Sequence, residues 1–253
     1  MTTTSPSPTA IAAAKALRQV MSGAAPLSAL PHGGEVTLQE AYDVQDDILR
    51  HHGPVGGWKV APLTDGDSRC SPLPASFFSA TPAVMDRKGA GFLEAEVEIA
   101  VRFGRDLPLR AAPYTEAEVA AAIGSVHPAI EFLSSRYVSR LTAPALNAVA
   151  DLQNCHAVVV GPGHALAGQE FSALDLDLTG DGVALGHARG GSTTAQTIAA
   201  LTWLVAHAAK RGYAISAGQT VITGARVGPI KVMPGAKLTA RVSSLGEVKA
   251  TIA

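Results

Sequence analysis

Apolar residues recur at two different spacings along the chain, and each spacing predicts a different kind of element. Residues 8–22 are rich in alanine and predict a first helix. Residues 37–50 predict a second helix, because Thr37-Leu38-Gln39-Glu40 is a capping box and Gly53-Pro54 stops the helical pattern. The apolar residues of this second helix lie at helical spacing: Leu38, Ala41, Val44, Ile48 and Leu49.

From residue 55 onward the pattern changes to short strands and turns. Residues 93–103 alternate with a period of two, so one face is apolar and the other carries Glu94, Glu96 and Glu98. The apolar face is formed by Leu93, Ala95, Val97, Ile99, Val101 and Phe103. Further strands are predicted at about 126–133, 156–160, 173–179, 219–224, 237–242 and 247–252.

Turn and cap residues place two more helices and a hairpin. Thr115-Glu116-Ala117-Glu118 is a second capping box and opens a short helix that ends near Gly124. A long helix follows at residues 192–211, with Ser192 as the expected N-cap and Gly212 just beyond its end. Gly180-Asp181-Gly182 predicts a hairpin turn.

Together these elements predict an α+β fold with a mostly β core. About eight short strands and four helices do not alternate along the chain, which argues against a regular βαβ fold. The first two helices suggest an N-terminal helical region at residues 1–54, followed by a β-rich domain at residues 55–253. Neither GxGxxG nor GxxxxGK[ST] occurs, so a dinucleotide or P-loop site has no support.

Charge and composition exclude several classes of partner. Twenty basic and twenty-one acidic residues give a net charge of -1 without a basic stripe, which argues against nucleic acid and membrane surfaces. The most apolar stretch, 195–209, is shorter than the roughly 20 residues that a bilayer span needs. Cys70 and Cys155 are far apart and form no CxxC motif. With no signal peptide evident, we expect reduced cysteines and a cytoplasmic protein.

The three glutamates of the strand at 93–103 are the most unusual feature of the sequence. Side chains on one face of a strand lie about 6.6 Å apart, so these like charges repel one another. One interpretation is a solvated face of an edge strand. The other is a site for a hard cation, with Glu96 and Glu98 joined by Glu131 from the apolar strand that follows. A carboxylate among such apolar neighbours needs a partner.

Several motifs, in order, resemble the 2-keto-4-pentenoate hydratase and 4-oxalocrotonate decarboxylase group of the fumarylacetoacetate hydrolase superfamily. The resemblance spans residues 37–252. It rests on Ala41-Tyr42-Asp43-Val44-Gln45, Val55-Gly56-Gly57-Trp58-Lys59-Val60, Glu96-Val97-Glu98-Ile99-Ala100, His127-Pro128-Ala129-Ile130-Glu131, Arg136, Ala150-Asp151, Val221-Ile222-Thr223-Gly224, Pro234-Gly235 and Leu245-Gly246-Glu247-Val248.

The resemblance implies a mixed β-roll catalytic domain, a bound Mg²⁺ or Mn²⁺, and a 2-oxo or 2-hydroxydienoate acid as substrate. It favours Glu96, Glu98 and Glu131 as metal ligands and leaves Glu94 as an extra, solvated acid. Three carboxylates leave about three positions of an octahedral ion for water or substrate. Homo-oligomers are typical of the family, so we expect one here.

The resemblance also assigns roles to other residues. Lys59 matches the catalytic lysine, and the nearby carboxylates should hold its pKa up, so we expect a cation or proton donor rather than a base. Asp151 is a second catalytic candidate, weighed against a structural role in a turn. Arg136, Thr223 and Gly224 are expected to bind substrate, although structural packing explains Thr223 and Gly224 equally well.

The chain departs from the family pattern where proton-transfer acids are usual. Residues 72–77 contain no acid, Ser134 stands where an aspartate is common, and residues 151–154 read Asp-Leu-Gln-Asn instead of Asp-Asn-x-Ser. Asp65 and Asp67 are the available substitutes, although exposed loop acids are common.

These departures leave the reaction open. No histidine lies between Lys59 and Glu98, which makes acylpyruvate-type C–C hydrolysis less favoured than lyase chemistry. We therefore predict a metal-dependent lyase, a hydratase before a decarboxylase. The alternative is a weakly active or non-catalytic homologue that binds a keto acid as a partner subunit.

Overall fold

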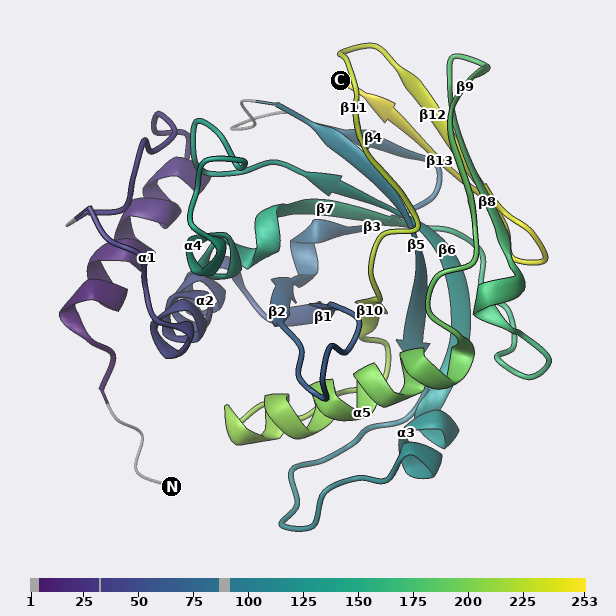
Figure 1. Ribbon diagram of the computed structural model, residues 1–253, viewed down its shortest axis with the longest axis horizontal. Coiled ribbons are helices and arrows are strands. Elements are labelled where there is room, and N and C mark those ends of the chain that lie inside the picture. Colours follow the sequence, from purple (N-terminus) through teal and green to yellow (C-terminus); the bar gives the residue numbers. More distant parts are fainter. Residues whose placement is uncertain (1–4, 32, 87–91) are drawn as a thin grey trace.

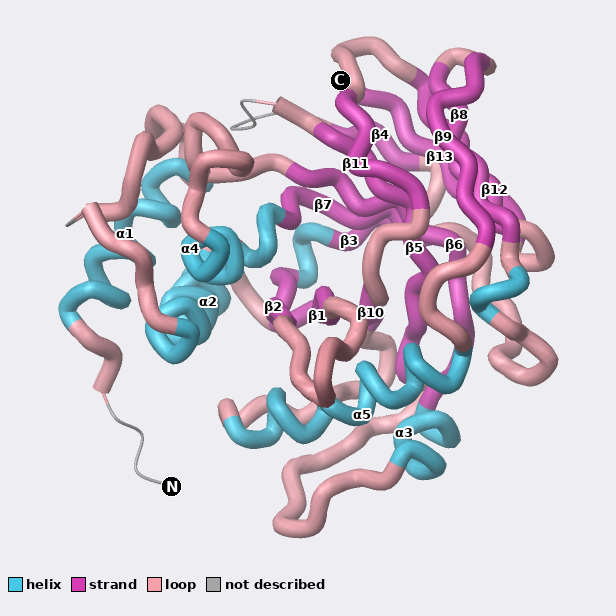
Figure 2. The backbone as a smooth tube through the Cα atoms, in the orientation of Figure 1, coloured by secondary structure: helices cyan, strands magenta, loops and turns pink. Residues whose placement is uncertain are grey.

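The computed structural model describes residues 5–31, 33–86 and 92–253, which form two packed β-sheets with helices around them. Figure 1 and Figure 2 show three helices gathered at one end of the molecule and the second sheet at the other. The α-helices are α1 (Pro8–Met21), α2 (Leu38–His52), α3 (Glu116–Ala122), α4 (Ala145–Ala150) and α5 (Thr194–Lys210). None of the helices described is long and apolar enough to cross a membrane.

The larger sheet has eight strands and carries the acidic strand near its centre. Its order is β2-β1-β10-β5-β6-β7-β3, and β11 pairs with the other half of β5. The sheet is mixed, since β1–β10 and β3–β7 are parallel and the other pairs are antiparallel. Its strands are β1 (Val55–Val60), β2 (Cys70–Pro74), β3 (Phe78–Ala80), β5 (Glu94–Phe103), β6 (Ile123–Leu133), β7 (Cys155–Val160), β10 (Thr220–Ile222) and β11 (Val227–Lys231).

The smaller sheet has five strands in the order β4-β13-β12-β8-β9 and packs against β5 and β6 of the larger one. The predicted hairpin joins β8 to β9, because Gly180 pairs with Val183 and both Asp181 and Gly182 have positive φ. Its strands are β4 (Ala83–Met85), β8 (Asp175–Gly180), β9 (Val183–Arg189), β12 (Lys237–Val242) and β13 (Gly246–Ile252). The α+β fold with N-terminal helices and mixed sheets is therefore confirmed.

Local capping chemistry sets where the helices begin. Thr37 and Thr115 each form the predicted capping box. The N-cap of α5 is Thr193, not Ser192 as expected, because the Thr193 side chain accepts from Gln196 N while the Gln196 side chain accepts from Thr193 N. The Ser192 carbonyl is instead an acceptor for Arg226.

The N-terminal helices and the larger sheet share one continuous core. α1 packs on α2, and α2 packs on α4 and β2. Leu17, Ile48, Leu152 and Trp58 are all fully buried in this core. The interpretation of residues 93–103 as a solvated edge strand is wrong, because β5 has neighbours on both sides and the smaller sheet beside it.

Candidate metal centre

Three glutamates from two neighbouring strands meet in the interior of the larger sheet. Glu96 on β5 lies directly opposite Glu131 on β6, and Glu98 follows two residues later on the same face. Ala129 lies opposite Glu98, so a small side chain leaves room for the third carboxylate. Carboxylate oxygens of the three glutamates lie within 4.8 Å of one another, and all three residues are buried. Within the described chain, no other group of His, Cys, Asp or Glu meets this condition.

The three carboxylates are held together against their own electrostatics. Burial raises the pKa of Glu96 to about 7, and Glu131 adds to that effect while Lys59 opposes it. Burial likewise raises the pKa of Glu98 well above its ordinary value. Glu98 Oε1 is buried and has no hydrogen-bond partner among the described residues. An orphaned carboxylate oxygen between two further carboxylates fits a divalent, oxygen-preferring cation.

The ammonium group of Lys59 lies against the glutamate cluster. Its Nζ donates to both carboxylate oxygens of Glu131, at 2.8 and 2.7 Å, and to the Gln153 carbonyl at 3.4 Å. Burial alone would lower the pKa of Lys59, but Glu131, Glu98 and Glu96 outweigh it and hold that pKa above its ordinary value. The predicted direction of the pKa shift is confirmed, and it favours the protonated form of Lys59. Its role as a donor rather than a base stays a prediction.

Two glycines let the backbone approach the glutamates. Gly224 has φ +106° and its N–H donates to Glu98 Oε2 at 2.7 Å. Gly228 has φ +101°, and a Cβ there would lie 2.5 Å from the Ala95 carbonyl oxygen. A side chain at position 228 would therefore push β11 away from β5 beside Glu96.

Cys155 also contacts the cluster, which the sequence alone did not suggest. Its thiol donates to Glu131, and burial raises its pKa well above the ordinary value. Both cysteines are free and buried, as expected. Glu131 therefore has a neutral donor as well as the Lys59 ammonium.

Arg136 and Asp151, predicted as a substrate-binding and a catalytic residue, pair with each other. Arg136 Nε donates to Asp151 Oδ1, and the Arg136 backbone N–H donates to Asp151 Oδ2 at 2.9 Å. Ser135 Oγ adds a further hydrogen bond to Asp151 at 3.2 Å. Both charged residues are buried, with 5% and 0% of their surface exposed. The contacts described for the pair are with each other, with Ser135 and with the Cys155 carbonyl. The catalytic role of Asp151 and the substrate contact of Arg136 stay predictions.

The chain after Asp151 takes an uncommon conformation. Leu152, Gln153 and Asn154 have φ of +51°, +52° and +62°. Left-handed backbone costs about 1–2 kcal/mol per residue for side chains other than glycine, and asparagine tolerates it best. Hydrogen bonds from Asn154 N to Asp151 O and from Ser134 N to Asn154 O hold the segment.

Thr223 and Gly224, predicted to bind substrate, use their donors within the protein. Thr223 Oγ1 donates to the Ile99 carbonyl at 2.8 Å, and Gly224 N–H donates to Glu98. They secure β10 and its following residue to β5 and to a carboxylate of the cluster. Substrate contacts by these two residues stay a prediction.

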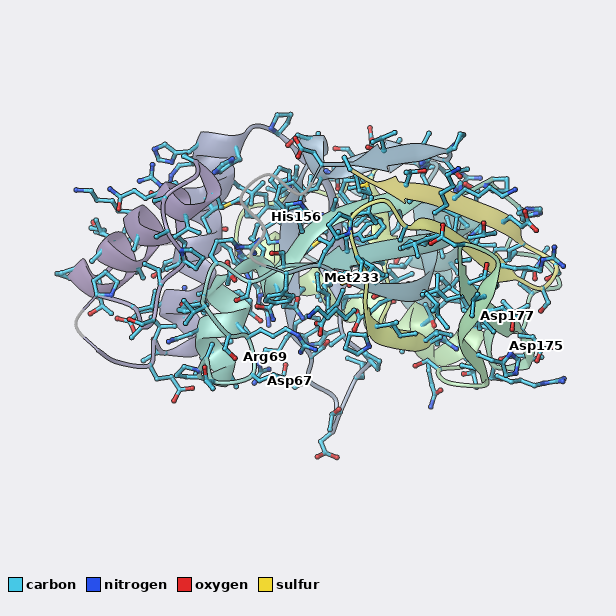
Figure 3. The ribbon with its side chains drawn as sticks, turned by 90° about the horizontal axis from the view of Figure 1, so that it is seen from above. Asp67, Arg69, His156, Asp175, Asp177 and Met233 are labelled. Atoms are coloured by element: carbon cyan, nitrogen blue, oxygen red, sulfur yellow. The ribbon has the colours of Figure 1, made fainter. Side chains whose placement is uncertain are left out.

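The other acids noted in the sequence lie outside the cluster. Glu94 was expected to be solvated, but it is half-buried and accepts from Arg140 Nε at 2.5 Å. Asp65 and Asp67 are exposed, and Asp67 is paired with Arg69. Figure 3 shows Asp67 and Arg69 together, well away from Asp175 and Asp177 on the smaller sheet.

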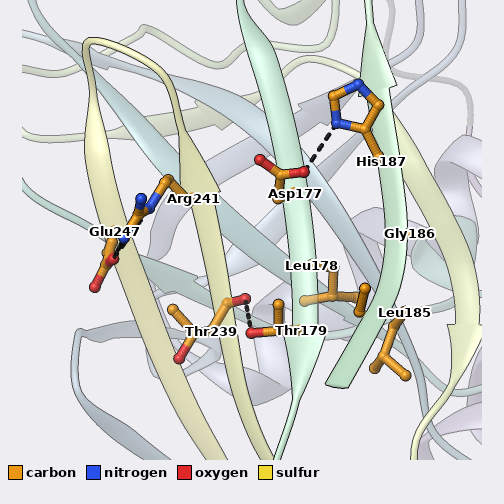
Figure 4. Close-up of a pocket in the computed structure, with 10 residues that line it drawn as sticks. Asp177, Leu178, Thr179, Leu185, Gly186, His187, Thr239, Arg241 and Glu247 are labelled. Atoms are coloured by element: carbon orange, nitrogen blue, oxygen red, sulfur yellow. Dashed lines mark hydrogen bonds and ion pairs between the residues drawn. The ribbon is translucent and has the colours of Figure 1, made fainter. Parts of the chain in front are cut away.

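A surface depression lies elsewhere. It has a volume of about 520 Å³ and lies over β8, β9, β12 and β13 of the smaller sheet. Figure 4 shows its lining side chains, among them the exposed ion pairs Arg241–Glu247 and His187–Asp177. None of the three clustered glutamates lines it.

Known proteins resemble this chain in sequence and in fold. Residues 70–253 match the family described as fumarylacetoacetate (FAA) hydrolase, C-terminal. A 4-oxalocrotonate decarboxylase from Pseudomonas sp. is 29% identical over 226 residues, which cover 84% of this chain and 86% of the relative. A 2-keto-4-pentenoate hydratase from Burkholderia vietnamiensis (strain G4 / LMG 22486) is 25% identical over 236 residues, covering 90% of each chain.

Solved structures extend the likeness to nearly the whole chain. The 4-oxalocrotonate decarboxylase from Pseudomonas putida G7, complexed with magnesium and adipate, superimposes with a TM-score of 0.82. The two are 22% identical, and the alignment covers 98% of this chain and 100% of the other. At this identity the likeness establishes the fold.

Proposed function

Because the chain belongs to the fumarylacetoacetate hydrolase family, we propose that it is a metal-dependent lyase acting on 2-oxo-enoate or 2-hydroxydienoate acids. Glu96, Glu98 and Glu131 would hold Mg²⁺ or Mn²⁺. The observation that carries the proposal is the buried cluster itself, with an orphaned oxygen on Glu98 and a protonated Lys59 beside it. Burying these like charges costs stability unless a bound cation and a matching substrate offset their repulsion.

The chemistry of this site would be stabilisation of a dienolate. The divalent ion supplies a Lewis acid for the C1 carboxylate and C2 oxygen of a 2-oxo acid. Lys59 contributes a fixed positive charge and an N–H donor in the same buried surroundings, where an electrostatic donor has its largest effect. Its ammonium can also return a proton to the substrate once negative charge has developed there.

The pairing of Asp151 changes which lyase reaction we favour. Conjugate addition of water needs a base to activate the water, and Asp151 was the buried acid available for that step. Asp151 is instead paired with Arg136, and Asp65 and Asp67 are exposed. Decarboxylation of a 2-oxo-3-enedioate needs no such base.

In that reaction the C5–C6 bond breaks and C6 leaves as carbon dioxide. The electron pair moves through C4 and C3 to the C2 oxygen, which then takes a proton. The product is 2-hydroxypenta-2,4-dienoate. A relative crystallised with the six-carbon diacid adipate supports a substrate of this length.

Hydration is the second candidate, because a relative that matches over 90% of its length is a 2-keto-4-pentenoate hydratase. It would protonate 2-hydroxypenta-2,4-dienoate on carbon and add water at C4, giving 4-hydroxy-2-oxopentanoate. Lys59 is a suitable acid for the first step, but the base for the second has no counterpart among the acids discussed above.

One experiment distinguishes the candidates. The protein, with and without Mg²⁺, is given 2-oxohex-3-enedioate, 2-hydroxypenta-2,4-dienoate and an acylpyruvate, and products are identified by mass spectrometry. Carbon dioxide with the dienoate supports decarboxylation, 4-hydroxy-2-oxopentanoate supports hydration, and pyruvate with a free acid would make the protein a hydrolase. No metal-dependent turnover of the first two acids would contradict the lyase proposal. The expected homo-oligomer stays a prediction, which sedimentation analysis can check.

A further inference from the structure

A short left-handed turn between α4 and β7 is held at both ends by one side chain. Arg136 Nη2 donates to the Asp151 carbonyl at 2.6 Å, and Arg136 Nη1 donates to the Cys155 carbonyl at 3.0 Å. The turn between these two anchors is Leu152–Asn154. The Leu152 side chain is fully buried, so core packing also holds the turn in place. The buried Arg136–Asp151 pair thus secures a specific backbone path.

This path brings Gln153 to Lys59. The Gln153 carbonyl accepts from Lys59 Nζ, and the Gln153 side-chain oxygen accepts from Ser71 Oγ at 3.0 Å. Ser71 lies directly opposite Lys59 in the β1–β2 pair. Gln45 Nε2 donates to Ser71 Oγ at 2.9 Å from α2, so three separate elements converge beside the lysine.

We propose that this turn positions Lys59, with Gln153 as the positioning residue, and that Arg136 and Asp151 serve the site through it. The proposal rests on the proposed function, in which Lys59 faces the substrate. It assigns a role to three consecutive residues with left-handed backbone.

The physical reason is the freedom of a lysine side chain. An ammonium on a four-carbon stem presents three rotatable donors and has no preferred direction of its own. Two donors of Lys59 go to Glu131, which is also a candidate metal ligand and so has to share its oxygens. Gln153 offers the third donor an acceptor outside the glutamate cluster. Strained backbone of this kind persists where the surroundings enforce it, typically at functional sites.

Four variants distinguish the effect of relieving backbone strain from the effect of moving Lys59. Gln153→Gly relaxes the left-handed backbone and removes the link to Ser71, whereas Gln153→Asn keeps a residue that tolerates this conformation but shortens its reach. Ser71→Ala removes only the hydroxyl partner. Ser244→Gly is the matched control, because Ser244 also has a left-handed φ of +60° and lies on the turn between β12 and β13.

Metal affinity, KM, kcat and thermal stability are measured for all four variants. We expect Gln153→Gly to keep or gain stability while kcat falls about tenfold, within the range seen when a catalytic group is slightly misplaced. Gln153→Asn and Ser71→Ala should lose less, and KM and metal affinity should stay unchanged. Ser244→Gly should gain similar stability with no change in kcat. Lower stability that accounts for the lost activity, or an unchanged kcat in Gln153→Gly, would overturn the proposal.

A second measurement needs no substrate. The rate at which acetic anhydride modifies Lys59, followed by peptide mass spectrometry, should rise about fivefold in Gln153→Gly and stay unchanged in Ser244→Gly. Glycine keeps the carbonyl, but the relaxed backbone no longer holds it against Lys59 Nζ, which is equivalent to losing one hydrogen bond. Equal rates in both proteins would overturn the positioning role. The two proposals can also fail separately. If the modification rate rises in Gln153→Gly but the wild-type protein turns over none of the acids, the positioning role is supported and the proposed function is contradicted.

Discussion

The two sheets carry similar charged side chains in opposite settings. On and beside the larger sheet, three glutamates and the Arg136–Asp151 pair are buried, and Lys59 is half-buried. Burial first, and the neighbouring carboxylates second, raise the pKa of Glu96 and Glu98. On the smaller sheet, the Arg241–Glu247 pair is exposed, and the pKa of Glu247 is lowered by Arg241. The depression described above lies on the smaller sheet, and none of the clustered glutamates lines it. Buried charges with shifted pKa values are therefore a better guide to the candidate site than this hollow is.

The largest effect is expected from the buried ion pair. Arg136→Gln leaves the Asp151 carboxylate buried without its cation, which should cost about 3–5 kcal/mol of unfolding free energy. The exposed counterpart, Arg241→Gln, should cost far less, because solvent screens that pair. Urea unfolding of both variants measures the difference, and comparable losses would show that burial does not separate the two sheets.

The metal cluster gives the next largest effect. Glu98→Gln removes a ligand whose Oε1 has no other partner among the described residues, and it should weaken Mg²⁺ or Mn²⁺ binding about 100-fold or more. Glu94→Gln is the matched control, since Glu94 lies on the same strand face but pairs with Arg140. Calorimetric titration that found equal losses in both variants would move the site away from Glu98.

Lys59→Met tests the cation beside the cluster. Turnover should fall about 100-fold, the scale of losing one electrostatic stabiliser. Metal affinity should stay the same or rise slightly, because an ammonium bonded to Glu131 competes with the ion for its charge. Lys59→Arg keeps the charge without the compact donor and should restore little. Loss of metal binding with normal turnover at saturating metal would make Lys59 a structural residue.

The pH dependence of metal binding is a smaller effect. The pKa of Glu96 is raised to about 7, so at lower pH a proton occupies the carboxylate that the metal needs. Apparent metal affinity should rise by up to about tenfold per pH unit below 7 and then level off. The same shift makes the metal-free protein lose stability as pH rises from 4.5 through about 7, because the folded state holds this proton more tightly. Metal titrations at several pH values check the first effect, and a flat profile would contradict it.

The smallest effect is expected on the smaller sheet. Asp177→Asn removes an exposed partner of His187 in the large depression. Turnover and metal affinity should both stay within error of the wild type, since none of the clustered glutamates lines that surface. A marked loss of activity would mean that the depression takes part in catalysis.

Features with a local cause could be predicted from the sequence. The capping boxes at Thr37 and Thr115 depend on residues three positions apart, and the period-two pattern of residues 94–103 depends on one strand. Long, regular segments were therefore placed well. The helix α4 and five short strands, β1, β2, β3, β4 and β11, were not placed, because three to six residues carry too little pattern of their own.

Features that depend on long-range contacts could not be predicted from the pattern. The opposition of Glu96 and Glu131 needs the register of two strands. The apolar neighbours of Glu131 and the resemblance both suggested it as a third ligand, but neither gave that register. The choice of Arg136 as the partner of Asp151 depends on where the chain returns after α4. Positive φ at Leu152 and Gln153 runs against the preference of both residues and is imposed by their surroundings.

The order of strands in the larger sheet has a consequence for a chain made from its N-terminus. Lys59 on β1 is connected to β5 across the sheet by β10, which begins only at Thr220. The lysine and all three glutamates therefore emerge from the ribosome well before β10, the strand that joins β1 to β5. A nascent chain that stops short of this strand contains every charged residue of the site but lacks the strand that aligns them. A segment synthesised after all four of these residues, which contributes none of the three glutamates and no lysine to the cluster, completes the sheet that brings them together.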